Sequence, residues 1–182
     1  MGFKFRKANL NDIDELEHLI ELSAKSINSL FYTESEINAA LGNVWAVDKQ
    51  LLIDQTYWIV ENLEGIVIGC GGWSKRKLLF GKPKSLTQTE SELKPGLDPA
   101  RIRAFFVHPE YTRRGIGKKL LIKSEIEAQF GGYNSLELVA TLSGEKLFSA
   151  QGYKKIKTFE LNLGNGITNK VVLMNKTIAS TF

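Results

Sequence analysis

The chain has 182 residues, a usual length for one domain, and its 43% hydrophobic and 24% charged residues are typical of globular proteins. This balance argues against intrinsic disorder, which requires low hydrophobicity and a large net charge. The single cysteine, Cys70, excludes an internal disulfide framework, and two histidines besides it are too few for a structural zinc site, so no metal is expected. The net charge of +4 is too small to indicate nucleic-acid binding, but it would suit a polyanionic small ligand if the positive charges are clustered.

Targeting and membrane segments are not apparent in the sequence. No apolar run approaches the roughly 20 residues that cross a bilayer. The first residues, MGFKFRKANLND, lack the apolar centre of a signal peptide. We therefore expect a cytoplasmic protein with neither a membrane nor a nucleic acid as its partner.

The first quarter of the chain predicts one strand followed by helices. Residues 3–6 alternate apolar and basic side chains, as a half-buried strand does. Apolar residues recur at helical spacing over residues 13–27 behind an acidic start, which favours a helix. Thr33 and Glu36 have the spacing of a capping box that opens a second helix. We expect a further helix over residues 45–55.

The middle of the chain predicts a hairpin and a long connection. Residues 56–62 are rich in aromatic and β-branched side chains, and a second apolar run begins at residue 66 after Gly65. Residues 75–100 then carry lysines, a polar stretch and two prolines. Connections of that length usually have a function of their own.

The second half of the chain predicts strands that alternate with helices. A strand over residues 102–107 ends at His108-Pro109, because proline cannot donate to a central ladder. The other expected elements are a helix over 115–130, a strand over 135–140, a short helix over 142–151 and strands over 155–163 and 169–175. Together they predict an α/β fold in which a single central mixed sheet is flanked by helices on both faces, in one domain over residues 1–182.

The segment IRAFFVHPEYTRRGIGKK at residues 102–119 carries the clearest chemistry. The first N–H groups of its helix have no acceptor within the helix, and the helix dipole makes that end positive. Gly115 and Gly117 let a ligand approach these amides closely. The cations around the same point are Arg113, Arg114, Lys118 and Lys119. Such an arrangement predicts phosphate binding.

The P-loop and three-glycine Rossmann patterns are absent. The segment VHPEYTRRGIG at residues 107–117 instead resembles the signature of the GNAT superfamily of acyl-CoA-dependent N-acetyltransferases, Gln/Arg-x-x-Gly-x-Gly/Ala after a strand that ends in Val-x-Pro. Thr112 stands where the family has Gln or Arg. A second family landmark, Tyr-x-x-x-Gly-Phe, is similar to FSAQGY at residues 148–153, and the order of elements matches over nearly the whole chain.

The resemblance implies a site for acetyl-CoA. In this family a bulge in the strand before the turn exposes backbone groups to the pantetheine arm, which here would be those of Phe105, Phe106 and Val107. An N–H near Phe106 or Val107 would polarise the acetyl carbonyl, so Val107 is an expected catalytic group. The other implied cofactor contacts are Arg113, Arg114, Gly115, Ile116, Gly117, Lys118, Thr141 and Phe148.

The family's proton donor is replaced in this chain. The tyrosine that usually protonates the leaving thiolate aligns with Phe148, which has no proton to donate. Either the thiolate leaves unassisted, or another group protonates it. The candidates, which the sequence does not rank, are Tyr111, Ser149 and Tyr153.

The general base is also not obvious. The family often has a carboxylate on the strand before the turn, where this chain has Arg101 and Arg103. Candidate bases are Glu137 on the next strand and Glu90 or Glu92 in the long connection. Because arginine binds carboxylates in a bidentate manner, the two arginines suggest an acceptor that carries a carboxylate, with Arg103 as a substrate-binding residue.

The acceptor site is expected in the regions that match no motif, residues 19–43 and 75–100. Trp73 and Phe80 either line an acceptor pocket or pack in the core. Cys70 is expected to be a small buried packing residue and not a nucleophile.

These patterns predict an enzyme that transfers an acetyl group from acetyl-CoA directly to a primary amine, for which a small molecule is favoured over a protein. No activated Cys–His pair indicates a covalent acetyl-enzyme. One alternative is a non-catalytic acyl-CoA-binding module, which Phe148 and the unclear base leave open. Another is a nucleic-acid or protein-interaction domain that uses the basic residues 75–84, to which a net charge of +4 gives little support. Many members of the superfamily dimerise, so a homodimer is a further expectation.

Overall fold

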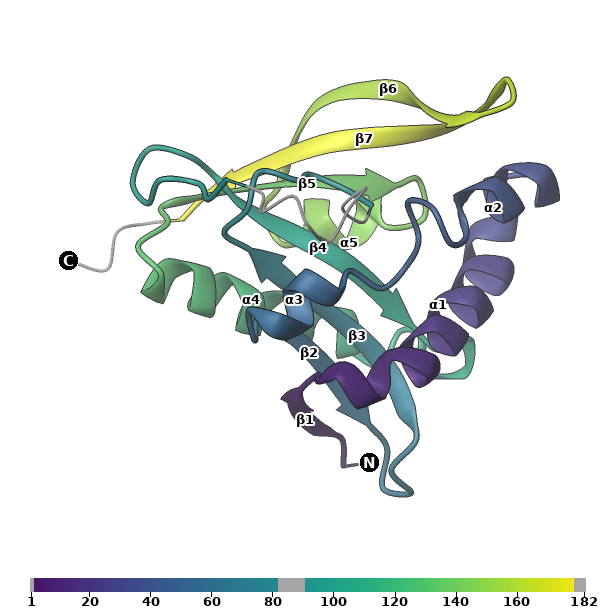
Figure 1. Ribbon diagram of the computed structural model, residues 1–182, viewed down its shortest axis with the longest axis horizontal. Helices are drawn as coiled ribbons and strands as arrows, with labels where there is room; N and C mark the ends of the chain where they lie inside the picture. The colour runs from purple at the N-terminus through teal and green to yellow at the C-terminus, as the bar shows by residue number, and fades with distance from the viewer. Residues whose placement is uncertain (1, 82–90, 179–182) are drawn as a thin grey trace.

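A seven-stranded sheet forms the centre of the computed structural model, which describes residues 2–81 and 91–178 (Figure 1). The strand order is β1-β2-β3-β4-β5-β7-β6. The strands are β1 (Lys4–Lys7), β2 (Tyr57–Glu61), β3 (Val67–Ser74), β4 (Ala100–Val107), β5 (Ser135–Thr141), β6 (Lys154–Gly164) and β7 (Ile167–Thr177). Neighbouring strands are antiparallel except β4 and β5, which are parallel. The predicted mixed sheet is confirmed.

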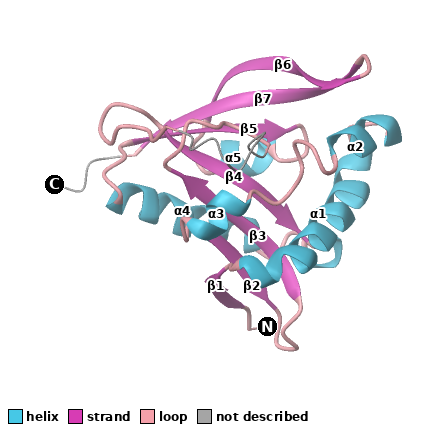
Figure 2. Cartoon of the chain, viewed as in Figure 1, coloured by secondary structure: helices cyan, strands magenta, loops and turns pink. Residues whose placement is uncertain are grey.

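Helices cover both faces of this sheet (Figure 2). They are α1 (Ile13–Ile27), α2 (Glu34–Ala40), α3 (Lys49–Ile53), α4 (Ile116–Phe130) and α5 (Glu145–Ala150). Successive strand side chains point to opposite faces, so neighbours in β2 enter different cores. Ile59 packs with the apolar residues of α1, whereas Val60 packs with Ile116 and Leu120 of α4. The strands therefore hold α1 and α4 on opposite sides of the sheet.

Most local expectations match the structure, with one clear difference. The capping box is present, since the Glu36 carboxylate accepts from the Thr33 N–H at 2.7 Å and the Thr33 hydroxyl accepts from the Glu36 N–H. The helix expected over residues 45–55 is confined to Lys49–Ile53. Asp48 caps it by accepting from the Gln50 N–H at 2.9 Å, which holds residues 45–48 outside the helix.

Strand β4 carries a bulge just before the glycine turn. Arg103 and Phe106 pair with β3 residues that are two positions apart, so β4 has one extra residue. Ala104 within the bulge has a φ of 56°, in the left-handed region. The buried Tyr57 hydroxyl donates to the Ala104 carbonyl at 2.6 Å and holds this conformation. The bulge, at Ala104 and Phe105, thus overlaps the start of the segment implied by the resemblance, Phe105–Val107.

The bulge coincides with a separation of β4 from β5. Their pairing is limited to Ala100 with Leu136 and Arg101 with Glu137, at the start of both strands. Beyond that point the remaining residues of β4 have no ladder partner in β5.

Across residues 2–81 and 91–178, every helix is too short or too polar to span a bilayer.

Candidate active site

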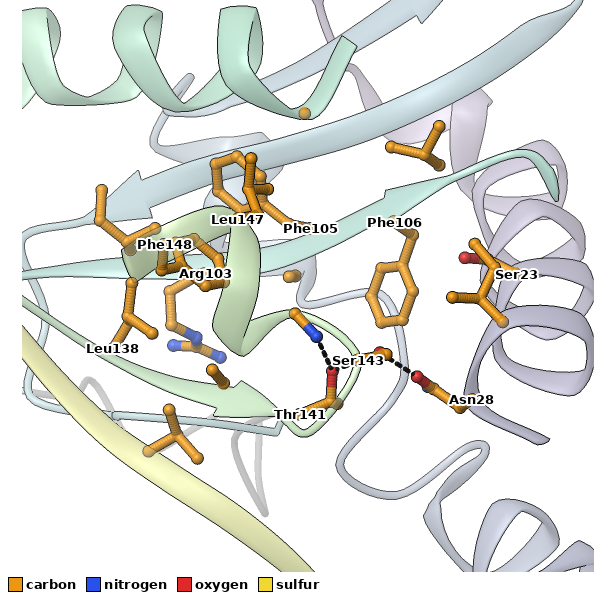
Figure 3. Close-up of a pocket in the computed structure, with 18 of the residues that line it drawn as sticks. Ser23, Asn28, Arg103, Phe105, Phe106, Leu138, Thr141, Ser143, Leu147 and Phe148 are labelled. Atoms are coloured by element: carbon orange, nitrogen blue, oxygen red, sulfur yellow. Dashed lines mark hydrogen bonds between the residues drawn. The ribbon is translucent and has the colours of Figure 1, made fainter. Parts of the chain in front are cut away.

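A cavity of about 610 Å³ opens where β4 and β5 separate (Figure 3). One end is formed by the turn before α4 and the start of that helix. The walls come from β4, β5 and α5. The other end is formed by α1, residues 44–46 and residues 79–81. The cavity therefore joins the glycine turn to segments that lie far away in the sequence.

The backbone of Val107 faces this cavity. The next residue, His108, donates its N–H to the Ile68 carbonyl of β3 at 2.9 Å. Backbone amides alternate in direction along a strand, so the Val107 N–H points to the edge that β5 has left. An N–H in this position can donate to a ligand oxygen without breaking the sheet.

The glycine turn leaves room for an anion at the start of α4. Gly115 is the N-cap, with a φ of 79°, a conformation that strains other residues. A Cβ at Gly117 would lie 3.0 Å from a Leu147 methyl, so a side chain there would close the space between α4 and α5. The amides of the first turn have no acceptor within the helix. This backbone fits a diphosphate group.

Positive charge gathers at the same end of the cavity. Arg113, Lys118 and Lys146 line it, and Arg113 and Lys118 are exposed. The Arg114 guanidinium lies 4.9 Å from the centre of the Tyr111 ring. Of the four cations singled out in the sequence, Arg113 and Lys118 line the cavity, whereas Arg114 and Lys119 are not in its lining.

A chain of hydrogen bonds crosses the middle of the cavity (Figure 3). The Ser143 hydroxyl donates to Asn28 Oδ1 at 2.5 Å and lies 2.9 Å from the Thr141 hydroxyl. Because the Ser143 proton is used in this way, the Thr141 hydroxyl is the donor to Ser143. Thr141 in turn accepts from the Gly144 N–H at 3.2 Å. The sequence analysis missed Asn28 and Ser143, because no motif marks them and the fold brings them together across 115 residues.

The ring of Phe148 is packed into the cavity wall. It is 7% exposed and makes edge-to-face contacts with Phe105 at 5.9 Å and with Tyr153 at 5.7 Å. Because Phe148 is held between these two rings, its side chain contributes to the packing of the cavity wall.

Among the candidate proton donors only Tyr111 lines the cavity, and its hydroxyl accepts from Asn62 at 3.2 Å. Ser149 is exposed outside the cavity lining. Tyr153 is buried outside it, and burial raises the pKa of its hydroxyl. Of the three, Tyr111 is therefore the one candidate in the cavity lining, and its hydroxyl keeps its own proton because it accepts from Asn62.

The candidate bases lie elsewhere. Glu137 pairs with Arg101 at the closed start of the β4–β5 pair and does not line the cavity, which corrects the expectation that it acts as a base. Glu92 pairs with Lys75 at 2.7 Å. Glu90 lies outside the described residues. Of the cavity-lining residues that the structure describes, none is a carboxylate.

Arg103 is not available to bind a substrate carboxylate. Its guanidinium pairs with Asp48 at 3.2 Å, and the side chains of the two residues are 3% and 4% exposed. It also donates to the carbonyls of Leu78, at 2.9 Å, and Gly81. The predicted role of Arg103 is therefore corrected, because its charge is already paired within the protein.

The two aromatic candidates for the acceptor pocket are separated. Phe80 lines the cavity. Trp73 lies outside the cavity and is 8% exposed; its indole donates to Glu127 at 3.1 Å, and its ring packs on Tyr133 with the ring centres 5.8 Å apart.

Cys70 is fully buried, and burial raises the pKa of its thiol to about 12, which excludes a ready nucleophile at neutral pH.

Comparison with known proteins gives one consistent result. A sequence model described as an acetyltransferase (GNAT) domain matches residues 54–155. A search of curated proteins finds no match. A GCN5-related N-acetyltransferase from Rhodopseudomonas palustris has a similar structure, with a TM-score of 0.71, 20% identity and coverage of 98% of this chain and 97% of that one.

Two further similar structures were determined with a bound cofactor. One is the PaiA N-acetyltransferase from Thermoplasma acidophilum in complex with coenzyme A, with a TM-score of 0.67, 18% identity and coverage of 97% and 99%. The other is yncA, a putative acetyltransferase from Salmonella typhimurium with acetyl-CoA, with a TM-score of 0.62, 14% identity and coverage of 98% and 95%. At these identities the likeness concerns the fold.

Proposed function

The chain belongs to the GNAT family of acetyltransferases and is an acyltransferase, and from this premise we propose that it transfers the acetyl group of acetyl-CoA directly to the primary amine of a small molecule. One observation carries the proposal. A single cavity connects the glycine turn, the outward-facing strand amide of Val107 and the space lined by α1, residues 44–46 and residues 79–81, so both substrates can be held together.

In this proposal the diphosphate of acetyl-CoA lies on the first-turn amides of α4. Arg113 and Lys118 lie beside it, and charge-assisted hydrogen bonds to phosphate are about twice as strong as neutral ones. The pantetheine arm follows the open edge of β4. Two of the solved structures with this fold hold coenzyme A or acetyl-CoA, which supports the choice of cofactor.

The Val107 N–H is the group that we propose to stabilise the reaction. Acetyl-CoA supplies an activated thioester, and negative charge develops on its carbonyl oxygen as the amine attacks. A donor that is fixed in place before the reaction stabilises this charge without reorganisation. Tyr57 contributes indirectly, since its hydroxyl fixes the Ala104 carbonyl and with it the bulge that turns Val107 outward.

No side chain is required to protonate the departing sulfur, because the thiolate of coenzyme A is itself a good leaving group. We propose that the hydroxyls of Thr141 and Ser143 supply the polar surroundings of the reacting atoms. The acceptor amine then loses its proton to water at the cavity mouth. Burial raises the pKa of the Cys70 thiol, so this residue is a poor nucleophile for a covalent acetyl-enzyme, which is consistent with direct transfer.

The proposal is tested by two linked measurements. Calorimetry compares acetyl-CoA, coenzyme A and ATP, and we expect micromolar binding of the first two and much weaker binding of ATP. A thiol-release assay with a panel of amines then detects turnover. Binding without release for any amine would favour the non-catalytic acyl-CoA-binding module, and absence of binding would overturn the cofactor assignment.

A further inference from the structure

The two ends of the cavity differ in chemistry. The cations that line the end at α4 are Arg113, Lys118 and Lys146. The opposite end, which we call the acceptor slot, is lined mainly by apolar side chains. These are Ile27, Val44, Trp45, Leu79, Phe80 and Leu161. The uncharged polar side chains near the slot are Ser23 of α1 and Asn28, which directly follows that helix (Figure 3).

One charged side chain reaches the slot, and it is neutralised within the protein. Arg103 donates to Asp48, which follows the wall formed by residues 44–46. The same guanidinium donates to the carbonyls of Leu78 and Gly81, which bracket the two apolar residues of the other wall. Arg103 therefore ties both walls together, and no unpaired charge remains among the described residues that line the slot.

This arrangement restricts what the slot can bind. Moving an apolar group from water into the slot is favourable, by roughly 25 cal/mol for each Å² that is buried. Among the described residues that line the slot, a carboxylate would find no unpaired cation and a second ammonium would find no carboxylate. A buried charge without a partner is strongly unfavourable.

From these observations, and resting on the proposed acetyl transfer, we propose that the acceptor is a primary monoamine with an apolar body, such as an arylalkylamine or an alkylamine. Phe80 contacts that body and determines specificity. Arg103 is a positioning residue that acts through the slot walls.

The test uses two matched pairs of amines that differ by one charged group. Phenylalanine differs from 2-phenylethylamine by a carboxylate, and 1,6-diaminohexane differs from hexylamine by a second ammonium. We expect kcat/KM to be at least about tenfold higher for the apolar member of each pair, a discrimination typical of pockets built for one polarity. Equal rates, or faster rates with the charged members, would overturn the proposal.

A binding measurement separates this inference from the proposed function. The same amines are titrated into the protein saturated with coenzyme A. Tighter binding of the apolar members supports the slot assignment whether or not acetyl transfer is observed, and the absence of that preference overturns it. Failure of coenzyme A itself to bind would instead contradict the proposed function.

Two variants test the residues. In Phe80→Asp the slot gains a carboxylate, so the preference for hexylamine over 1,6-diaminohexane should fall by about tenfold or reverse. Leu63→Asp is the matched control, because Leu63 is 85% exposed and lies outside the cavity. For Arg103→Lys we expect KM for the amine to rise several-fold while KM for acetyl-CoA stays unchanged. Equal changes in both KM values would show a general structural role and contradict the positioning role.

Discussion

The cofactor end and the acceptor end of the cavity are built in different ways. At the cofactor end, one continuous segment from Val107 to Lys118 presents backbone amides and local cations. At the acceptor end, side chains from α1, residues 44–46, residues 79–81 and strands β6 and β7 converge. In the proposed complex, backbone groups would recognise what all acyl-CoA molecules share, whereas converging side chains can change without loss of the fold. The difference teaches that cofactor binding and acceptor choice can be altered separately.

The largest expected effect is on stability, from breaking the ion pair that joins the slot walls. Arg103→Met leaves the Asp48 carboxylate buried without its partner, and loss of one member of such a pair costs about 3–5 kcal/mol. Chemical denaturation of the variant and the wild type measures the difference in the free energy of unfolding. The double variant Arg103→Met/Asp48→Asn should recover part of the loss. A single variant as stable as the wild type would show that the pair does not hold the walls.

Gly117→Asp tests the cofactor end. In the proposed complex its carboxylate would lie beside the diphosphate, and it would narrow the space next to Leu147. Acetyl-CoA affinity should therefore fall by at least about 100-fold, since like charges at close range disfavour binding. Calorimetry measures the affinity, and circular dichroism shows that the fold is retained. Ser149→Asp adds the same charge outside the cavity and should bind acetyl-CoA as the wild type does. If Gly117→Asp bound acetyl-CoA as tightly as the wild type, the diphosphate site could not lie at this turn.

Tyr57→Phe tests whether the bulge links the two ends. The variant leaves the Ala104 carbonyl without its buried donor, which should lower stability by about 1–3 kcal/mol. Because the bulge orients the strand amide, we also expect kcat to fall several-fold with either amine. Steady-state kinetics with 2-phenylethylamine and hexylamine provide the measurement. A loss of stability with an unchanged kcat would show that Tyr57 stabilises the core but does not orient the strand amide for catalysis.

The smallest effect is expected at the boundary between the two ends. Phe148→Tyr restores the hydroxyl of the family at a ring that packs on Phe105 and Tyr153. We expect kcat to rise by no more than a few-fold, since in the proposed mechanism the thiolate leaves without assistance, and we expect the acetyl-CoA affinity to stay the same. Stopped-flow thiol release reports the rate of departure. A rate loss of tenfold or more would mean that the wall cannot accommodate the hydroxyl.

The same contrast explains how much could be predicted from the sequence. The turn at residues 113–118 is a local motif, and its glycines and cations predicted an anion site at the start of α4 that the described geometry fits. The sheet and its flanking helices followed from periodicity, apart from the short helix capped by Asp48. Local pattern suffices where adjacent residues form the structure.

The acceptor end could not be predicted in this way. Arg103 was taken for a substrate ligand because nothing in its neighbourhood reveals that Asp48, 55 residues earlier, would neutralise it. Glu137 was a candidate base, but the parallel register places it opposite Arg101. Trp73 faces Glu127 on the other side of the sheet from the cavity-lining α1. Such pairings depend on tertiary contacts that no local spacing encodes.

The central claim is that both substrates occupy one cavity and that the acetyl group passes directly between them. The most direct measurement varies acetyl-CoA and 2-phenylethylamine together and identifies the product by mass spectrometry. The account predicts intersecting double-reciprocal lines and one N-acetyl group on the amine. Parallel lines with an acetylated protein would show a covalent intermediate and contradict direct transfer, and the absence of any acetylated amine while acetyl-CoA is bound would contradict the enzyme's proposed acceptor.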